Sequence, residues 1–415
     1  MQMHTFTFDK KLKTGTLAMV ALGVLCLIVL FLTDHNPGHA RFWSNLLHHG
    51  VFFTGIALMA LFFLATCVTA FAGWHTIFKR VWEAISLFLP FGLGVIIIIG
   101  IGNYLGWHHL YHWTDHEAVL TDELLVNKSS FLNNGWYLFG TIIIGGLWYF
   151  FAHKIRSLSL DEDKQGDENF KYHHKLRIWS AAFLPIAGFS SASMVWQWIM
   201  SIDAHWYSTL FAWYCGSSWF VSMICFTVLI MLYLTGKGYY PQFKKDHLHD
   251  LGKFLFAFSI FWTYLWFSQY MLIWYGNVGE ETIYFRTRQD QYPALFYLNL
   301  GINFLVPLLI LMRNDTKRKL GTMSLVAVIV LFGHWLDYFL MIKPGVAHTM
   351  HEMAVEHGAY NHGTAVGFAL PGLLEIGTFI GFIGLFLFRV FRQLEKASLV
   401  PANDPYLSES LHHHV

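Results

Sequence analysis

His334, Asp337 and Glu375 lie inside long apolar stretches of the chain, where few charged residues occur. The spacing of three residues places His334 and Asp337 on the same face of a helix. Imidazoles and carboxylates bind and release protons, and both can form a hydrogen bond with a quinone head group. These residue types therefore predict proton transfer or a quinone-head environment.

The chain that carries these residues is unusually apolar. Hydrophobic residues make up 55% of its 415 residues and charged residues only 13%, whereas soluble domains carry about 25% charged residues. A net charge of +1 provides no basic surface for nucleic acid. The composition therefore predicts an all-α integral membrane protein that contacts lipids and has no nucleic-acid partner.

Ten apolar runs approach or exceed the length of about 20 residues that a membrane-spanning helix needs. They cover residues 15–33, 50–72, 82–106, 134–153, 178–200, 209–235, 251–275, 293–312, 322–342 and 364–389. Most lysines and arginines fall at the N-terminus, in the even-numbered connections and in the tail, which predicts cytoplasmic termini. We expect a solvated cytoplasmic loop at 154–175 and a cytoplasmic tail at 390–415.

Amides accompany the ionisable groups in spans seven and eight, at Gln269, Asn299 and Asn303. Hydrogen bonding between helices is the alternative interpretation of the whole polar set, and it suits the amides best. Ionisable groups cost about 2.5–3.5 kcal/mol each on membrane-insertion scales, so the histidine and the two carboxylates indicate function. From the rise per residue, we expect Glu375 about 17 Å from the outer face, near the level of the histidine.

The 24 histidines suggest a haem or metal hypothesis. His334 alone falls deep inside an expected span, whereas a haem between helices needs two facing imidazoles. The run GWHHLYHWTDHE at 106–117 offers metal-ligand spacing, but histidines beside tryptophans at a membrane interface explain it equally well. The four cysteines lack ligand spacing and indicate packing. We expect no bound metal and no covalently attached cofactor.

Two longer motifs resemble a known family. SIDAHWYSTLF (201–211) and YLWFSQYMLIWYGNVGEET (264–282) resemble the NrfD/PsrC-like membrane subunits. More narrowly, they resemble the smaller (ActF-type) subunit of bacterial alternative complex III, a quinol:electron-acceptor oxidoreductase. The resemblance covers essentially the whole chain and implies one NrfD-like transmembrane domain over residues 1–415. Its implied parts are a four-helix bundle at about 50–200, a second at about 209–342, and flanking helices at 15–33 and 364–389.

The resemblance implies a metal-free, multi-pass subunit of a respiratory complex in the bacterial inner (cytoplasmic) membrane. Such a subunit supports quinol oxidation and conducts protons, and it is not catalytic alone. The implied partners are multihaem c-type cytochrome subunits, an iron–sulfur subunit, a larger NrfD-like sister subunit and a terminal oxidase. Haem and iron–sulfur centres belong to those partners, and a quinone or quinol is the ligand implied for the membrane part.

A quinol site built from a histidine and a carboxylate is a further implication of the resemblance. His108 or His109 falls where that histidine is expected, but span 134–153 has no acidic residue to supply the carboxylate. We therefore expect quinol oxidation in the larger sister subunit and a proton path in this chain. Asp203 and His205 are expected at the outer interface, where they either dock a partner or form the outer exit of that path.

Two alternatives stay open. A proton-coupled secondary transporter also uses carboxylates within many spans. A purely structural anchor of a redox complex would tolerate replacement of Asp337 and Glu375. In either complex-based interpretation, we expect docking surfaces on the outer side at 108–117 and 343–362.

Overall fold

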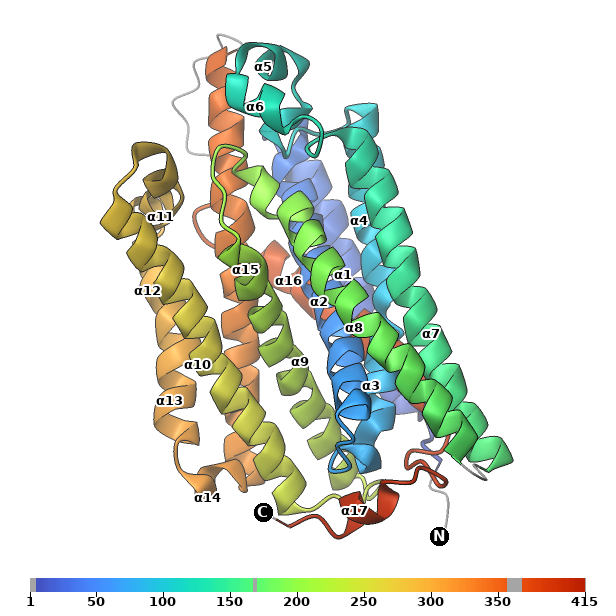
Figure 1. The fold of residues 1–415 in the computed structure, drawn as a ribbon. Helices are drawn as coiled ribbons and strands as arrows, with labels where there is room; N and C mark the ends of the chain where they lie inside the picture. Colours follow the sequence, from blue (N-terminus) through green and yellow to red (C-terminus); the bar gives the residue numbers. More distant parts are fainter. Residues whose placement is uncertain (1–4, 167–169, 357–367, 415) are drawn as a thin grey trace.

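The computed structural model describes residues 5–166, 170–356 and 368–414. Within these ranges, ten helices are long and apolar enough to cross a membrane (Figure 1). The predicted number of spans is therefore confirmed, and the chain is an all-α, multi-pass membrane protein in its described part. The only extended pairing found there is one isolated bridge between Thr5 and Ser398.

The ten spans are built from the following helices. They are α1 (Lys10–Thr33), α2 (Ala40–Thr69), α3 with α4 (Lys79–Ser86, Leu89–Leu105), η4 with α7 (Trp136–Gly140, Thr141–Gln165), α8 (Lys171–Trp198), α9 (Leu210–Gly236), α10 (Lys245–Gly276), α12 with η7 and α13 (Pro293–Leu300, Gly301–Leu305, Val306–Leu311), α15 (Leu320–Glu356) and α16 (Leu373–Leu394). The shorter helices are η1 (Pro37–His39), η2 (Thr76–Phe78), η3 (His112–Thr114), α5 (His116–Thr121), α6 (Glu123–Lys128), η6 (Met200–Ile202), α11 (Gly279–Gln291), α14 (Asn314–Lys317) and α17 (Leu407–Leu411).

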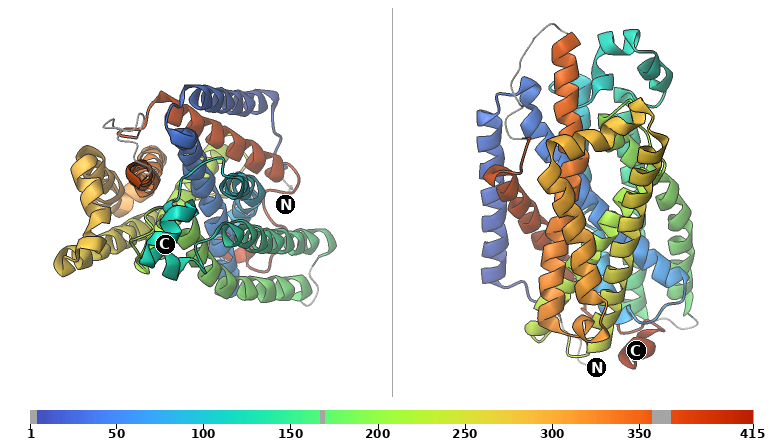
Figure 2. Two further views of the ribbon diagram at one scale, coloured as in Figure 1. Left: turned by 90° about the horizontal axis from the view of Figure 1, so that it is seen from above. Right: turned by 90° about the vertical axis from the view of Figure 1, so that its left-hand side faces the viewer.

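Helices α2, α9 and α15 form the centre of the molecule. α2 packs against α4, α8, α9 and α15, and α9 also packs against α10. Most residues of these three spans are buried and apolar; Phe52 and Phe53 of α2, for example, are both fully buried. A helix that is hydrophobic all round is one that the protein buries. Figure 2 shows α12 on one side of this centre and α7 with α8 on the other.

The first and last spans, α1 and α16, lie side by side along their length (Figure 2). Glycines permit this approach, since a Cβ at Gly381 would collide with the backbone of Gly23. A Cβ at Gly384 would lie 2.6 Å from Met19 Cβ and 2.8 Å from the Thr16 carbonyl oxygen. Small residues let helix backbones approach closely in a membrane, where van der Waals packing rather than the hydrophobic effect drives the association of helices.

Replacing Gly381 by leucine is expected to push α1 away from α16 and to destabilise the protein by about 1–3 kcal/mol, the usual cost of overpacking. The thermal unfolding midpoint in detergent measures the effect. Gly94→Leu on α4 is the matched control, because nothing lies within 4 Å of a Cβ placed there. Equal losses in the two variants would contradict the glycine contact.

Two expected ends of spans are wrong, one on the inner side and one on the outer side. In both places the helix continues to residues that find buried partners. The expected loop at 154–175 is largely helical, since α7 continues to Gln165 and α8 begins at Lys171. α15 continues past Lys343 to Glu356. Lys343 is fully buried, and its Nζ donates a hydrogen bond to Ser44 Oγ at 2.8 Å. It is therefore not part of an exposed docking surface.

The start of the last span is also corrected. α16 begins at Leu373 rather than at 364, and residues 357–367 lie outside the described residues. Pro371 therefore precedes the helix. At the opposite end of the molecule, Phe6 stacks on Phe391 with ring centroids 5.4 Å apart. The N-terminal segment and the end of α16 thus meet on one side, which we call the inner side.

Candidate functional site

Asp337 is the centre of a buried polar cluster that joins four helices. Its carboxylate accepts hydrogen bonds from the Tyr214 hydroxyl of α9, from Trp262 Nε1 of α10 at 2.9 Å and from Asn299 Nδ2 of α12 at 2.8 Å. All three donors are neutral. Within the described chain, no lysine or arginine forms an ion pair with Asp337, although its side chain is fully buried.

His334 lies one turn before Asp337 on α15, as the spacing predicts. Its Nδ1 shares a hydrogen bond of 2.9 Å with the Ser218 hydroxyl and lies 4.0 Å from Asp337 Oδ2. Its Nε2 is buried and has no hydrogen-bond partner among the described atoms. An imidazole nitrogen either donates or accepts a hydrogen bond. Nε2 of His334 is therefore available to exchange a proton.

Asn303 joins the cluster through a π-helical turn, η7. Its Nδ2 donates to Asn299 Oδ1 at 2.6 Å, and Asn299 in turn donates to Asp337. Gly333 of α15 faces the turn, and a Cβ at that position would collide with Asn303 Oδ1. π turns often occur at functional sites, because the extra residue redirects side chains. Asn303 is thus connected to the carboxylate through Asn299.

A cavity of about 20 Å³ lies against Asp337, and Gln269, Arg288 and Asn299 are among its lining residues. This volume suits about one water molecule. Gln269 Oε1 accepts a hydrogen bond of 3.0 Å from the Ser208 hydroxyl. Gln269 therefore belongs to the same site, and the cavity gives the carboxylate a place to exchange a proton with water.

A larger hollow on the outer side, which we call the outer vestibule, has a volume of about 590 Å³. Asp203, His205 and Glu280 are among its lining residues. Asp203 forms an ion pair of 2.9 Å with Arg288, which also lines the cavity beside Asp337. The Arg288–Asp203 ion pair therefore stands between the vestibule and the cavity. His205 Nε2 forms a hydrogen bond with the Asp122 carboxylate.

Glu375 does not join Asp337, contrary to the depth expected from the sequence. It lies in the first turn of α16 and caps that helix by accepting from the Gly372 backbone N–H at 2.9 Å. Arg41 binds both of its carboxylate oxygens, at 2.7 and 3.0 Å. The expected depth was wrong because the helix begins nine residues later than predicted. Compensated by a guanidinium, Glu375 has a structural role at the junction of α2 and α16.

The sequence predicts that His334 is the only histidine deep inside a span, and the structure corrects this prediction. His48 and His49 of α2 are fully buried, because α2 begins ten residues earlier than expected. His48 Nε2 lies 2.9 Å from the Trp335 carbonyl oxygen, and Trp335 Nε1 donates to His49 Nε2 at 3.1 Å. Both rings are held by protein partners, and they are adjacent on one helix rather than facing each other across two.

His108 and His109, the two candidates for a quinone-site histidine, have different environments. His108 is buried against Trp43, with ring centroids 4.5 Å apart, and its Nε2 lies 3.1 Å from the Ile99 carbonyl oxygen. His109 is exposed. Burial lowers the pKa of His108 to about 4 despite the hydrogen bond to Ile99. His108 is therefore a neutral, packed side chain against α2 and α4, apart from the polar cluster at Asp337.

The protein is expected to lose stability as the pH falls from about 6.5 towards 4, partly through His108. Between these values the unfolded chain binds a proton, at an ordinary histidine pKa of about 6.5, that folded His108 does not bind, so unfolding is favoured as the pH falls. His108→Phe should reduce this dependence, measured as the thermal midpoint at pH 7.5 and pH 5. His109→Phe is the control, and an identical pH dependence in both variants would contradict the prediction.

Sequence reasoning missed a buried cluster on the inner side, which we call the inner ion network. It consists of Lys79, Arg80, Glu83, Arg156, Glu162, Asp163 and Asp404. Glu83 accepts from Arg80 at 2.7 Å, from Arg156 at 3.0 Å and from the Ser159 hydroxyl. The sequence does contain a signal for this cluster, because Arg156, Ser159 and Asp163 recur at helical spacing within the expected loop at 154–175.

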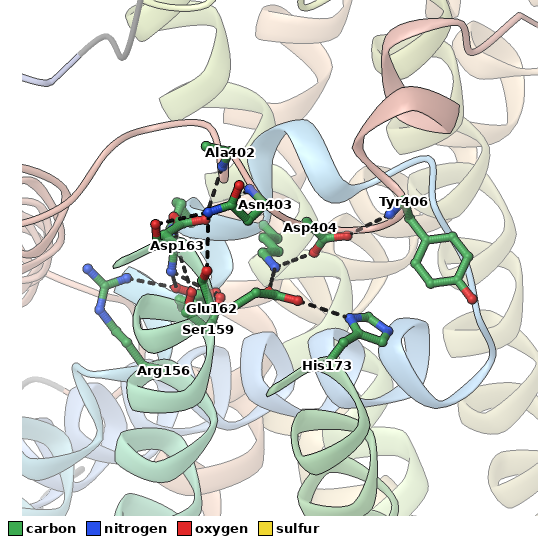
Figure 3. A network of polar contacts seen from close by, with 12 residues as sticks. Arg156, Ser159, Glu162, Asp163, His173, Ala402, Asn403, Asp404 and Tyr406 are labelled. Atoms are coloured by element: carbon green, nitrogen blue, oxygen red, sulfur yellow. Dashed lines mark hydrogen bonds and ion pairs between the residues drawn. The ribbon is translucent and has the colours of Figure 1, made fainter. Parts of the chain in front are cut away.

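The inner ion network also holds the C-terminal segment (Figure 3). Lys79 Nζ contacts both Asp404 and Glu162, and Asp163 accepts from the Ala402 backbone N–H at 3.0 Å. Burial opposes ionisation of Asp404, but the charge of Lys79 outweighs it and lowers the pKa of that carboxyl. Donor atoms of Glu162, Asp404 and His173 lie within 4.8 Å of one another, a spacing that could hold a metal ion. The Lys79 ammonium already supplies positive charge there.

The two sequence motifs supply residues to the outer vestibule and to the cavity beside Asp337. The first motif (201–211) supplies Asp203 to the outer vestibule, and the second (264–282) supplies Gln269 to the cavity beside Asp337. The two motifs are therefore parts of one region of the fold. No family model matches the chain, and no curated protein matches it.

Proposed function

We propose that this chain is the proton-conducting membrane subunit of a quinol:electron-acceptor oxidoreductase of the alternative complex III type. One observation carries the proposal: Asp337 is buried among membrane-spanning helices, bonded only to neutral donors, and adjacent to His334. A carboxylate charge inside a membrane is costly without a cation. Binding a proton removes that cost, so this group is suited to taking up and releasing protons.

A comparison with Glu375 and Asp203 separates this role from a structural one. Each of those carboxylates has an arginine partner, Arg41 and Arg288 respectively. Their charge is already balanced by that arginine, and a proton bound to the carboxylate would leave the arginine charge unpaired. Asp337 alone of the three lacks such a partner in the described structure, which supports its assignment as the proton-carrying group.

On the outer side, protons would pass between Asp337 and the vestibule through the water-sized cavity and past the Arg288–Asp203 ion pair. On the inner side, buried hydroxyl groups of α9 continue from the site. Ser222 donates to the Ser218 carbonyl oxygen at 2.8 Å, and Thr227 accepts from Trp82 Nε1 at 3.0 Å. Protons would move inward along these hydroxyl groups, with ordered water molecules bridging the gaps between them.

The proposal includes the finer arrangement that the family resemblance implies. Spans two to five and six to nine would form two four-helix bundles, with α1 and α16 at their side. The inner side would face the cytoplasm of a bacterium. Quinol oxidation itself would occur in the larger sister subunit, with haem and iron–sulfur centres in the other partners. A secondary transporter fits less well, because the cavity beside Asp337 has room for water and not for an organic substrate.

The proposal that this chain is a subunit of a quinol-oxidising complex is tested by purifying the tagged chain from its native membranes in mild detergent. We expect multihaem c-type and iron–sulfur subunits to co-purify, visible as haem spectra and in subunit mass spectrometry, with quinol-oxidation activity. A chain that purifies alone, colourless and inactive toward quinol, would overturn the proposal.

A further inference from the structure

A basic cavity of about 410 Å³ opens on the inner side between α7 and α16. From α7 it is lined by Tyr149, His153, Arg156, Ser157, Leu160, Asp161 and Lys164, from α16 by Arg389 and Gln393, and from the segment just after α16 by Lys396. Leu87, in the turn between α3 and α4, completes the lining. The polar site at Asp337 shares none of these residues. The cavity therefore has its own chemistry.

Positive charge dominates this cavity. Four cationic side chains line it, together with a single carboxylate, Asp161. Arg156 is already bound to Glu83 at 3.0 Å. Arg389 stacks on the Phe91 ring at 4.4 Å, and its buried Nε has no hydrogen-bond partner among the described atoms. No carboxylate in the described chain forms an ion pair with Arg389, so the cavity presents a guanidinium that lacks an anion.

An open, apolar strip continues from the cavity along α7 toward the membrane interior. The lining residues Tyr149 and His153 share a helix face with Gly146 and Ile142, since these positions recur at intervals of three or four. Ile142 is 44% exposed. Nothing lies within 4 Å of a Cβ placed at Gly146. A charged head group in the cavity could thus extend a hydrocarbon chain over this strip.

We propose that the cavity binds the phosphodiester head group of an anionic phospholipid, with one acyl chain lying over Gly146. Basic pockets between membrane helices on the inner side are suited to anionic head groups. Free inorganic phosphate could satisfy the cations but would make no use of the apolar strip. The lipid would also connect α7 to α16, which the hydrogen bond of 2.8 Å from the Arg156 guanidinium to the Gln393 carbonyl oxygen already joins.

The test is native mass spectrometry of the delipidated protein, or of its complex, titrated with dioleoylphosphatidylglycerol and, separately, with dioleoylphosphatidylcholine. We expect tighter binding of the anionic lipid. The double variant Lys164→Gln/Arg389→Gln should weaken that binding about tenfold or more, given the attraction of each basic residue. The matched control, Lys154→Gln/Arg392→Gln, removes one cation from each of the same two helices outside the cavity, and should change binding less than twofold.

A third variant, Gly146→Leu, separates lipid from free phosphate. Leucine is expected to fill the strip and to weaken binding of the anionic lipid without altering the cations. Equal loss in the cavity and control variants would overturn the proposal, since the attraction would then come from general surface charge. Equal binding of the two lipids, full displacement of the lipid by millimolar inorganic phosphate, or unchanged binding in Gly146→Leu would each overturn it as well.

Discussion

Replacing Asp337 by asparagine is expected to lower the quinol-oxidation turnover of the assembled complex by about 100-fold, the low end of the contribution of a positioned proton-transfer group. The amide has the shape of the carboxyl group but cannot carry the proton. If its oxygen takes the place of Oδ1, Tyr214 and Asn299 keep their acceptor, and only Trp262 loses one. We therefore expect the complex to assemble.

Turnover is measured together with proton release from liposomes that contain the purified complex. Asp337→Glu should recover part of both, because it restores a proton-binding group. Glu375→Gln is the matched carboxylate control: it removes a charge that Arg41 balances, so it should reduce thermal stability more than turnover. Turnover of Asp337→Asn within twofold of the natural chain would show that Asp337 is a structural anchor.

Replacing Glu83 by glutamine is expected to cause the largest loss of stability, about 3–5 kcal/mol in the free energy of unfolding. Glu83 is fully buried and binds two guanidinium groups, those of Arg80 and Arg156. Glutamine keeps one acceptor oxygen but has no charge to balance them. The remaining cations would then be buried without sufficient compensation, a state that costs far more than the loss of a surface pair.

Thermal unfolding in detergent, followed by tryptophan fluorescence, measures this loss. Asp290→Asn is the control, since Asp290 and its partner Arg286 form an exposed pair one helical turn apart at 3.4 Å. We expect little change there. A midpoint for Glu83→Gln that stays as close to the natural value as that of the control would refute a stabilising role for the inner ion network.

The spans could be predicted because hydrophobic runs are local, whereas several helix ends depend on partners far along the chain. α7 continues to Gln165 because Glu162 meets Lys79, which is 83 positions away. α15 continues past Lys343 because that ammonium reaches Ser44 in α2. Charged residues at such places have the pattern of solvated loops, and only the assembled fold supplies the counter-charge or the hydrogen-bond acceptor that permits their burial.

The candidate site was predictable to the extent that it follows from one helix. His334 and Asp337 share a face of α15 by spacing alone, whereas for Gln269 and Asn303 the sequence indicates only that amides accompany the ionisable groups in neighbouring spans. The pairing of Glu375 with Arg41 was not predictable, because the two residues are 334 positions apart. An error of nine residues in the start of α16 was sufficient to move that carboxylate from the middle of a span to its end.

The π-helical turn η7 makes this site sensitive to a kind of sequence change that most membrane proteins accommodate in loops. A π turn contains one residue more than an α turn. Deleting a single residue between Gly301 and Leu305 would convert η7 to ordinary α-helix and rotate the preceding segment by about 100° relative to the following one. Asn299 would then turn away from Asp337. Over evolutionary time, this span can accept substitutions, but its length is constrained as tightly as its composition.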